Sequence, residues 1–244
     1  MSPPVLTDEE IQSLIGRDRG RVAAERSGRP ASSAHRAGED AAALDALLGD
    51  GIHPTIDAAV GAARAAFLDY REMGLESRRA IVEAMRAAML REGGRLASLA
   101  HAETGLGRTE DKVQKNLLVT TKTPGPEDLE PEAATGDGGM TVTEYAPYGV
   151  IGSITPTTNP TSTIINNSIA MISAGNAVTF NVHPGATQVS VENIKLLNQA
   201  IVGAGGPADL ITATPRPTLE TAKELMDHPD VRVQMETGGP AEVA

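Results

Sequence analysis

One stretch constrains the fold more than any other: residues 145–167 combine a short apolar run, a polar turn and a helical pattern. The run from Val150 to Ile154 is rich in β-branched residues, which favours a strand. Residues 155–159 then form a turn, and Pro160 suits the first position of a helix, with Asn159 before it as a good cap. Because α/β sheets bind ligands where a helix starts beyond the carboxyl end of a strand, the sequence predicts a binding site here.

Downstream of this unit the sequence alternates between strand-like and helix-like segments. Short apolar runs at 177–180, 210–213 and 231–233 predict strands, and the spacing over 186–202 and 217–226 predicts helices. An order of β-α-β-α-β-α-β implies a parallel sheet with right-handed crossovers. The fold class predicted from the sequence is therefore α/β.

Upstream of the unit the pattern is helical. The spacing of apolar residues predicts helices over 56–70, around 81–89, over 95–103 and over 108–121. Residues 124–139 are rich in Pro and Gly, which predicts an irregular connection before a strand at 140–145.

The first fifty residues have a different character. Residues 5–15 place Leu6, Ile11, Leu14 and Ile15 on one helical face, and Thr7 and Glu10 have the spacing of a capping box. Such a short helix needs a partner surface in water, whether that surface belongs to another protein or to its own domain. The following segment is rich in Arg, Ala, Ser and Gly, which predicts a linker. We therefore expect an amphipathic peptide at 1–20, a flexible linker at 21–51 and a folded domain at 52–244.

Composition excludes several classes of function. The chain has no cysteine, so its residues form no disulfide, offer no cysteine ligands to a metal and hold no cysteine nucleophile. A net charge of −11 argues against general attraction to nucleic acid or membrane surfaces. The sequence shows neither a membrane-length apolar run nor a signal-peptide pattern, which predicts a cytoplasmic location. No metal site is expected.

Two runs of residues resemble a known family. The first extends from Tyr145 through Thr157, Thr158, Asn159 and Pro160, and the second from Glu103 to Asn116. Both resemble the CoA-acylating aldehyde dehydrogenases of bacterial microcompartments, within the aldehyde dehydrogenase superfamily. The resemblance covers residues 56–240 and implies the Rossmann-like cofactor-binding domain of that superfamily. Without the resemblance, the charges of the second run would be interpreted as a solvated helix face.

The resemblance also implies roles for individual residues. Asn159 would lie in the oxyanion hole, where an amide donor stabilises charge on a carbonyl oxygen. The residues implied beside the nicotinamide cofactor are Thr155, Pro156, Thr157, Asn181, His183, Pro184, Thr237, Gly238 and Gly239. Each has a simpler interpretation from the residues alone: Asn159 as a helix cap, His183 as a polar loop residue, and residues 237–240 as an ordinary turn.

The implied cofactor is NAD, with NADP not excluded, and the implied substrates are a short-chain aldehyde and CoA. The amphipathic peptide resembles the encapsulation peptides that bind microcompartment shell proteins, which predicts a location inside such a compartment. Full-length members of the family are expected to form homo-oligomers, and they continue into a catalytic domain with the nucleophilic cysteine. We therefore expect this chain to be inactive alone. The alternatives are a non-catalytic scaffold module and an unrelated nucleotide-binding protein, for which the sequence shows no organised Ser-His-Asp set.

Overall fold

The computed structural model describes residues 46–238, and these residues form a four-stranded parallel sheet covered by helices on both faces. The strand order is β5-β4-β3-β6. The strands are β3 (Val150–Ile154), β4 (Ala177–Asn181), β5 (Ile211–Ala213) and β6 (Val231–Glu236). All three pairings are parallel, which confirms the predicted α/β class.

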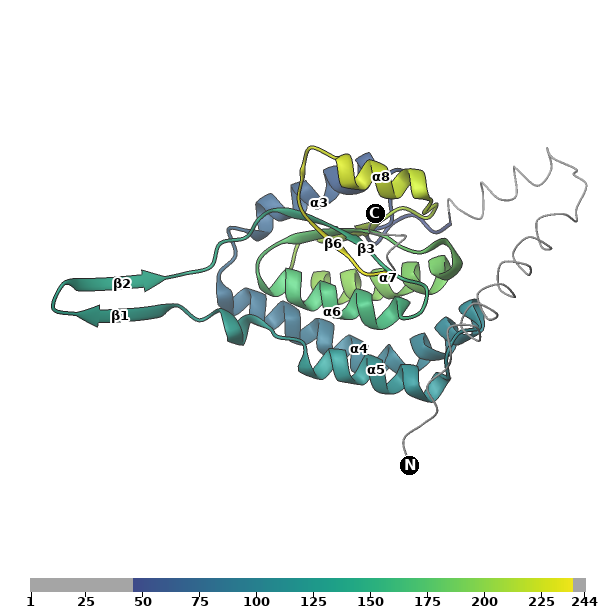
Figure 1. The fold of residues 1–244 in the computed structure, drawn as a ribbon, viewed down its shortest axis with the longest axis horizontal. Helices are drawn as coiled ribbons and strands as arrows, with labels where there is room; N and C mark the ends of the chain where they lie inside the picture. Colours follow the sequence, from purple (N-terminus) through teal and green to yellow (C-terminus); the bar gives the residue numbers. More distant parts are fainter. Residues whose placement is uncertain (1–45, 239–244) are drawn as a thin grey trace, which may run out of the picture. The chain divides into compact units, whose positions relative to one another are not determined.

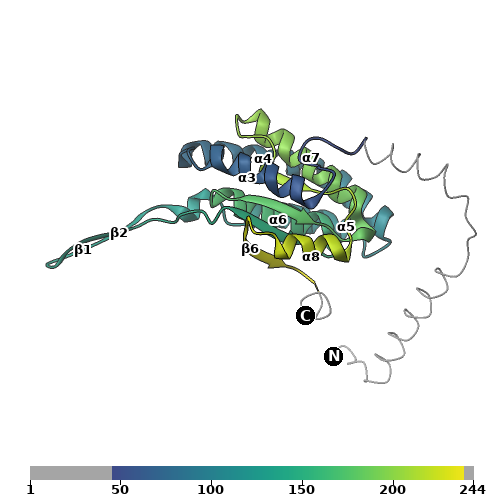
Figure 2. The same ribbon diagram turned by 90° about the horizontal axis from the view of Figure 1, so that it is seen from above.

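The helices lie in layers around this sheet (Figures 1 and 2). One face is covered by α3 (Ile56–Tyr70) and α8 (Leu219–Asp227), and the other by α6 (Pro160–Ser173) and α7 (Thr187–Gly203). A further layer, α4 (Leu75–Thr104) and α5 (Thr109–Lys122), packs against α6 and α7 rather than against the sheet. The core between the layers is made mainly of Ile, Val, Leu, Met and Ala, in keeping with the low aromatic content.

Tyr70 and Phe180 are the two fully buried aromatic side chains of the described residues. Tyr70 belongs to α3, and its hydroxyl donates a hydrogen bond of 2.9 Å to the carbonyl oxygen of Ile172 in α6. Burial raises the pKa of the Tyr70 hydroxyl well above its ordinary value, so this group stays protonated and acts as a donor.

The prediction of two separate helices over 81–89 and 95–103 is wrong, because α4 is one continuous helix of 30 residues. The Gly93-Gly94 pair does not end it. A Cβ atom on Gly93 would lie 3.5 Å from Cβ of Asn116, and the Asn116 amide donates to the Gly93 carbonyl oxygen at 2.9 Å. Helix α5 thus contacts this part of α4 through Asn116. The predicted helix end is found at Gly105, where φ is +67°.

Residues 124–139 are more regular than predicted. They contain a short 3₁₀ helix, Pro126–Leu129, and the strand β1 (Glu132–Gly136), which pairs antiparallel with β2 (Gly139–Thr143). All ten strand residues are exposed. The hairpin extends away from the four-stranded sheet in both views (Figures 1 and 2). The predicted strand at 140–145 is found as β2, while β1 was not predicted because residues 124–139 are rich in Pro and Gly and β1 buries no apolar face.

The fourth predicted strand is confirmed and runs three residues further, to Glu236. Its polar composition has a simple cause. Within the described residues β6 pairs only with β3 and forms an edge of the sheet, so its residues are exposed or half-buried.

The predicted peptide at 5–15 and most of the predicted linker lie outside the described residues. The end of the linker segment packs on the domain: Leu47 and Leu48 contact the core, and Gly51 fits closely against Asn198 and the Ile211 carbonyl oxygen. At Gly51 φ is +95°, and a Cβ atom would collide with both neighbours, so glycine is required. No helix within residues 46–238 is long and apolar enough to cross a membrane.

Candidate functional site

The predicted site residues gather at the carboxyl edge of the sheet. The register places Ile154 of β3 beside Asn181 of β4 and Glu236 of β6. The amide of Thr155 donates to the Asn181 carbonyl oxygen at 3.3 Å, and the amide of Thr237 donates to the Ile154 carbonyl oxygen at 3.1 Å. The turns that follow β3, β4 and β6 therefore begin at the same edge of the sheet, although these segments are far apart in the sequence.

The turn after β3, residues 155–159, contains a buried hydroxyl group. Thr155 is buried, and its Oγ1 atom has no hydrogen-bond partner among the described residues. Pro156 and Thr157 are half-buried, and a Cβ atom on Gly185 would lie 3.4 Å from Thr157 Oγ1. The turn after β3 thus touches the turn after β4. Because a buried hydroxyl without a partner is costly, Thr155 fits a site that is completed by a hydrogen-bonding ligand.

Asn159 stands at the N-cap position of α6, with Pro160 at the first helical position as predicted. Its side chain, however, makes no capping hydrogen bond. Instead Asn159 Oδ1 accepts a hydrogen bond of 2.9 Å from Nζ of Lys115, and Asn159 Nδ2 lies 3.3 Å from Thr158 Oγ1. The simple interpretation of Asn159 as a helix cap therefore fails, and its amide donor faces away from Lys115.

Two lysines of α5 donate hydrogen bonds to this turn. The sequence alone did not identify them as site residues. Nζ of Lys112 donates to the Thr158 carbonyl oxygen at 3.0 Å, three residues before the contact of Lys115 with Asn159. Lys112 is only 5% exposed, so the interpretation of these charges as a solvated face is wrong for this residue. Burial, with a smaller contribution from the charge of Lys115, holds the pKa of Lys112 below its ordinary value.

A buried polar network continues the same face of α5. Asn116 accepts a hydrogen bond of 2.9 Å from the Thr161 hydroxyl, and the Thr161 carbonyl oxygen accepts one of 3.1 Å from the amide of Asn193 in α7. The buried residues of α5 are polar, while Leu117 and Leu118 are exposed. A helix that turns its polar face inward is the signal that could have revealed this network, since polar groups are buried where they have partners.

The residues predicted after β4 are placed as follows. Asn181 is buried, and its Oδ1 accepts a hydrogen bond of 2.7 Å from the Thr221 hydroxyl of α8. His183 is half-buried, and its Nδ1 accepts from the Gly185 amide at 3.0 Å, while Pro184 is exposed. The side chain of Asn181 thus links the strand to α8. The proposed cofactor contacts of these three residues remain predictions.

The segment with the predicted site residues Thr237, Gly238 and Gly239 follows β6. Thr237 and Gly238 are exposed, and Gly239 lies outside the described residues. Thr237 lies beside the turn after β3, because its amide donates to the carbonyl oxygen of Ile154. The contact of this segment with a cofactor remains a prediction.

The helices that follow β3, β4 and β5, namely α6, α7 and α8, begin at this edge, and other side chains of the chain cap α7 and α8. Glu103 accepts hydrogen bonds of 2.9 and 2.8 Å from the Gln188 and Val189 amides in the first turn of α7. Thr218 forms a capping box with Thr221 at the start of α8. The start of α6 has no side-chain cap. Free amide hydrogens at a helix start favour an anion or a polar ligand, so the open start of α6 marks the centre of the site.

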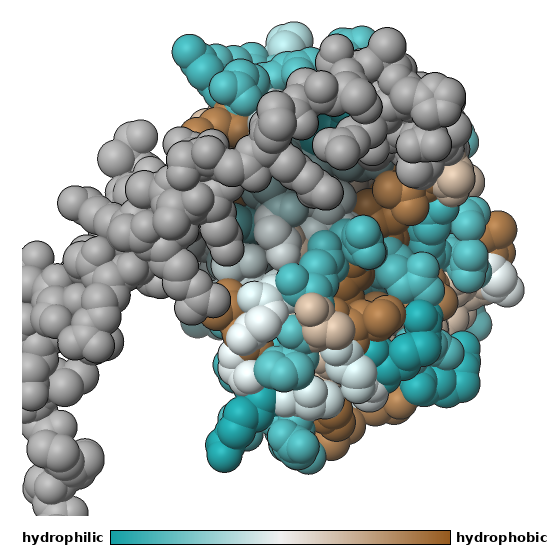
Figure 3. All heavy atoms as spheres, turned by 90° about the vertical axis from the view of Figure 1, so that its right-hand side faces the viewer, coloured by the Kyte–Doolittle hydropathy of each residue, from teal (hydrophilic) through white to brown (hydrophobic). Residues whose placement is uncertain are grey.

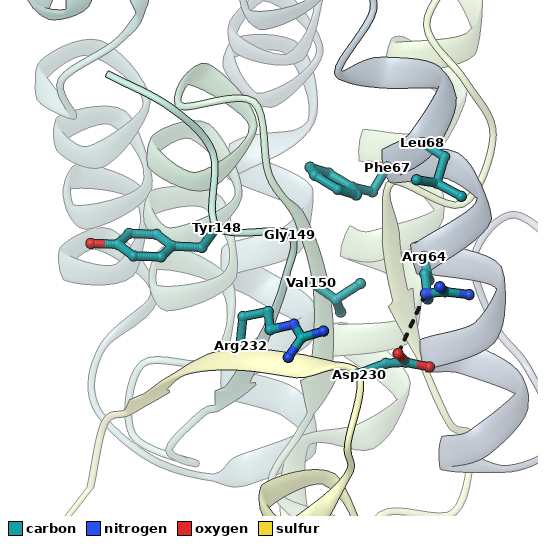
Figure 4. A pocket seen from close by; sticks show the side chains of 8 residues that line it. All are labelled: Arg64, Phe67, Leu68, Tyr148, Gly149, Val150, Asp230 and Arg232. Atoms are coloured by element: carbon teal, nitrogen blue, oxygen red, sulfur yellow. Dashed lines mark ion pairs between the residues drawn. The ribbon is translucent and has the colours of Figure 1, made fainter. Parts of the chain in front are cut away.

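The ends of α4, α6 and α7 that surround this site lie at the right of Figure 1, and Figure 3 shows that side as a mixture of hydrophilic, near-neutral and hydrophobic residues. A cavity of about 230 Å³ lies elsewhere, at the amino ends of β3 and β6 (Figure 4). Its residues include Tyr148, Arg232 and the ion pair of Arg64 with Asp230 at 3.4 Å. Among residues 46–238 no group of three or more His, Cys, Asp or Glu side chains is arranged to hold a metal ion.

Comparison with known proteins gives consistent matches. Residues 49–242 match the model of the aldehyde dehydrogenase family. The chain is 46% identical over 196 residues to a propanal dehydrogenase (CoA-propanoylating) of Citrobacter freundii, a match that covers 80% of this chain and 42% of the relative.

Two solved structures are similar in fold and sequence. An engineered glycolyl-CoA reductase with bound NADP+ gives a TM-score of 0.77 at 44% identity, covering 80% of this chain and 44% of that chain. A propionaldehyde dehydrogenase from the fucose utilisation microcompartment of Clostridium phytofermentans gives a TM-score of 0.77 at 40% identity, covering 79% and 44%. The chain thus spans less than half the length of these relatives.

Proposed function

Because the chain belongs to the aldehyde dehydrogenase family, we propose that residues 52–244 are the cofactor-binding part of a CoA-acylating enzyme. The reaction would convert a short-chain aldehyde, CoA and NAD or NADP to an acyl-CoA. The observation that carries the proposal is the arrangement at the start of α6, where Asn159 leaves the helix uncapped and keeps its amide donor free of the helix. The names of the similar proteins, which include CoA-propanoylating and NADP+-bound enzymes, support the substrate classes.

The residues at the carboxyl edge fit a dinucleotide. The Thr155 hydroxyl lacks a partner, the start of α6 is open, and Thr237 and Gly238 are exposed beside them. Pro156, Thr157, Asn181, His183, Pro184 and Gly239 complete the set that we propose around the cofactor. A bound nicotinamide would supply the hydride acceptor. The role of Asn159 would be to donate a hydrogen bond to the oxygen of the reacting carbonyl as negative charge develops on it.

The same residues do not supply a nucleophile. Chemistry of this type holds the acyl group on a thiolate, and the chain contains no cysteine. We propose that these 244 residues alone form no acyl-CoA from propionaldehyde, NAD and CoA. Formation of acyl-CoA by a monodisperse preparation of the purified chain would overturn both this mechanism and the assigned role.

The cofactor site is tested by titration calorimetry on the folded chain. We expect NAD or NADP to bind weakly, with a Kd of about 1 mM, equivalent to about −4 kcal/mol. Thr155→Val should weaken binding further, since it removes the unpartnered hydroxyl and keeps the shape of the side chain. Thr141→Val, in the exposed hairpin strand β2, is the control. The absence of binding by a protein with native circular dichroism would count against the proposal.

The alternative function is a non-catalytic scaffold, which the amphipathic pattern near the start of the sequence favours. We propose that residues 5–15 bind a microcompartment shell protein, because their apolar face needs a partner. That one similar structure comes from a microcompartment enzyme supports this partner class. A fluorescent protein fused to residues 1–20 should collect in shells, and Leu14→Glu should abolish this by placing a charge on the apolar face. Diffuse fluorescence of the unmutated fusion would exclude the proposed partner.

A further inference from the structure

The contact with Lys115 determines which way the side-chain amide of Asn159 faces. An ammonium group can only donate hydrogen bonds, so the Asn159 atom 2.9 Å from Lys115 Nζ must be the oxygen. The amide nitrogen therefore has to point the other way. Its one contact within the described residues is the Thr158 hydroxyl at 3.3 Å, which leaves a second N–H group without a protein partner there.

The start of α6 differs in backbone and side chain from two helix starts that are capped. The N-cap residues of α3 and α8, Thr55 and Thr218, have extended ψ values of 163° and 176°, and both side chains accept a hydrogen bond from the helix. Asn159 has a ψ of 54° and accepts none. Asparagine is among the best N-cap residues, so another interaction must hold its side chain away from the helix. Lys115 provides that interaction, and Lys112 holds the neighbouring Thr158 carbonyl oxygen.

We propose that Lys115 is a positioning residue, which holds the Asn159 amide so that its Nδ2 atom donates to the reacting carbonyl oxygen of the substrate. The inference rests on the proposed function of Asn159. The ammonium also polarises the amide, which strengthens the N–H donors on its other side. Lys112 supports the same turn by donating to the Thr158 carbonyl oxygen. Helix α5 therefore positions the turn with two lysine contacts but supplies no group that reacts.

The direct test is the side-chain amide signal of Asn159 in nitrogen-15 spectra of this chain, assigned by its loss in Asn159→Asp. In Lys115→Met we expect the two Asn159 amide proton signals to move by more than their line widths, because the amide is free to turn. Lys115→Arg should restore them, since a guanidinium also only donates. Lys122→Met, which changes an exposed lysine at the end of the same helix, should leave them in place.

A second measurement separates positioning from a merely structural role. The Lys115 contact is exposed, so the unfolding midpoint of Lys115→Met should equal that of the unmutated chain. A lowered midpoint would mean that Lys115 serves stability, and unchanged Asn159 signals in Lys115→Met would mean that it does not orient the amide. Either result overturns the proposal. Failure of NAD and NADP to bind, with the Asn159 signals still dependent on Lys115, would instead overturn the proposed function alone.

Discussion

The starts of α6 and α8 face the same edge of the sheet and are built in opposite ways. At α8, Thr218 caps the helix and exchanges hydrogen bonds with Thr221, so the chain itself supplies the capping interactions of this helix start. At α6, a residue type that caps equally well is turned away by Lys115. The first arrangement stabilises the fold. The second leaves a donor and helix amides free at the one place where the family resemblance predicts chemistry.

The hydrogen-bond partners of a helix start, rather than the type of its N-cap residue, therefore determine whether it stabilises the fold or stays open to a ligand. The start of α7 makes the same point, because Glu103 of a different helix supplies its acceptor from a distant part of the sequence. Residue type alone would rank Asn159 and Thr218 as equivalent caps and would miss Glu103. Substitutions at these three sites should therefore separate loss of function from loss of stability.

Asn159→Ala should have the largest effect, and it should fall on catalysis. In a hybrid enzyme in which residues 49–242 replace the matching segment of the Citrobacter freundii relative, kcat should fall about 10²–10³-fold, the usual cost of an oxyanion donor. The Kd for NAD or NADP should stay nearly constant, since the partner of the amide is the developing oxyanion. Steady-state kinetics and calorimetry measure the two quantities. Gln188→Ala, an exposed residue in the first turn of α7, is the control.

A result in which Asn159→Ala changes cofactor affinity and kcat equally would contradict this assignment. It would indicate that Asn159 contacts the cofactor in the ground state.

Thr218→Ala should have the opposite profile. Loss of an N-cap costs about 1 kcal/mol of folding free energy, so this variant should unfold at lower denaturant concentration. Asn159→Ala, which removes no capping bond, should unfold at nearly the same concentration as the unmutated chain. Equal destabilisation by the two substitutions, measured by urea unfolding, would erase the contrast between the two helix starts.

Glu103→Gln should have a smaller effect on stability. It removes the negative charge beside the Gln188 and Val189 amides, and a charge at a helix start contributes about 0.3–1 kcal/mol when it is exposed. The loss should shrink in high salt, because screening weakens the interaction of the carboxylate with the helix dipole. Urea unfolding at low and high salt measures it, with Glu110→Gln in α5 as a comparison. A loss that is independent of salt would indicate packing instead.

The sequence predicted the parallel sheet because its strands are short apolar runs separated by clear helical periods, as at Val150–Ile154. It predicted the edge where the site lies for the same reason: the ends of parallel strands meet in space. It missed the continuity of α4, since a Gly-Gly pair ends many helices and only the contact of Gly93 with Asn116 shows why this one continues. It missed Lys112 and Lys115 because their partners, Thr158 and Asn159, lie more than 40 residues away and charge pattern alone cannot reveal them.

The smallest expected effect is a change at Lys112 in how stability depends on pH. Burial lowers the pKa of Lys112 in the folded protein, while the unfolded chain keeps the ordinary lysine pKa of about 10.4. Between these two values the unfolded state binds more protons than the folded state, so the folding free energy becomes more favourable as pH rises. Lys112→Met should lack this contribution. The free energy of unfolding of the unmutated chain, minus that of Lys112→Met, should therefore increase from neutral pH to about pH 10. Urea unfolding at both pH values measures the difference. Lys122→Met, at an exposed position, should leave the pH dependence unchanged, and an equal rise in Lys112→Met would show that the Lys112 ammonium carries no burial penalty at the start of α6.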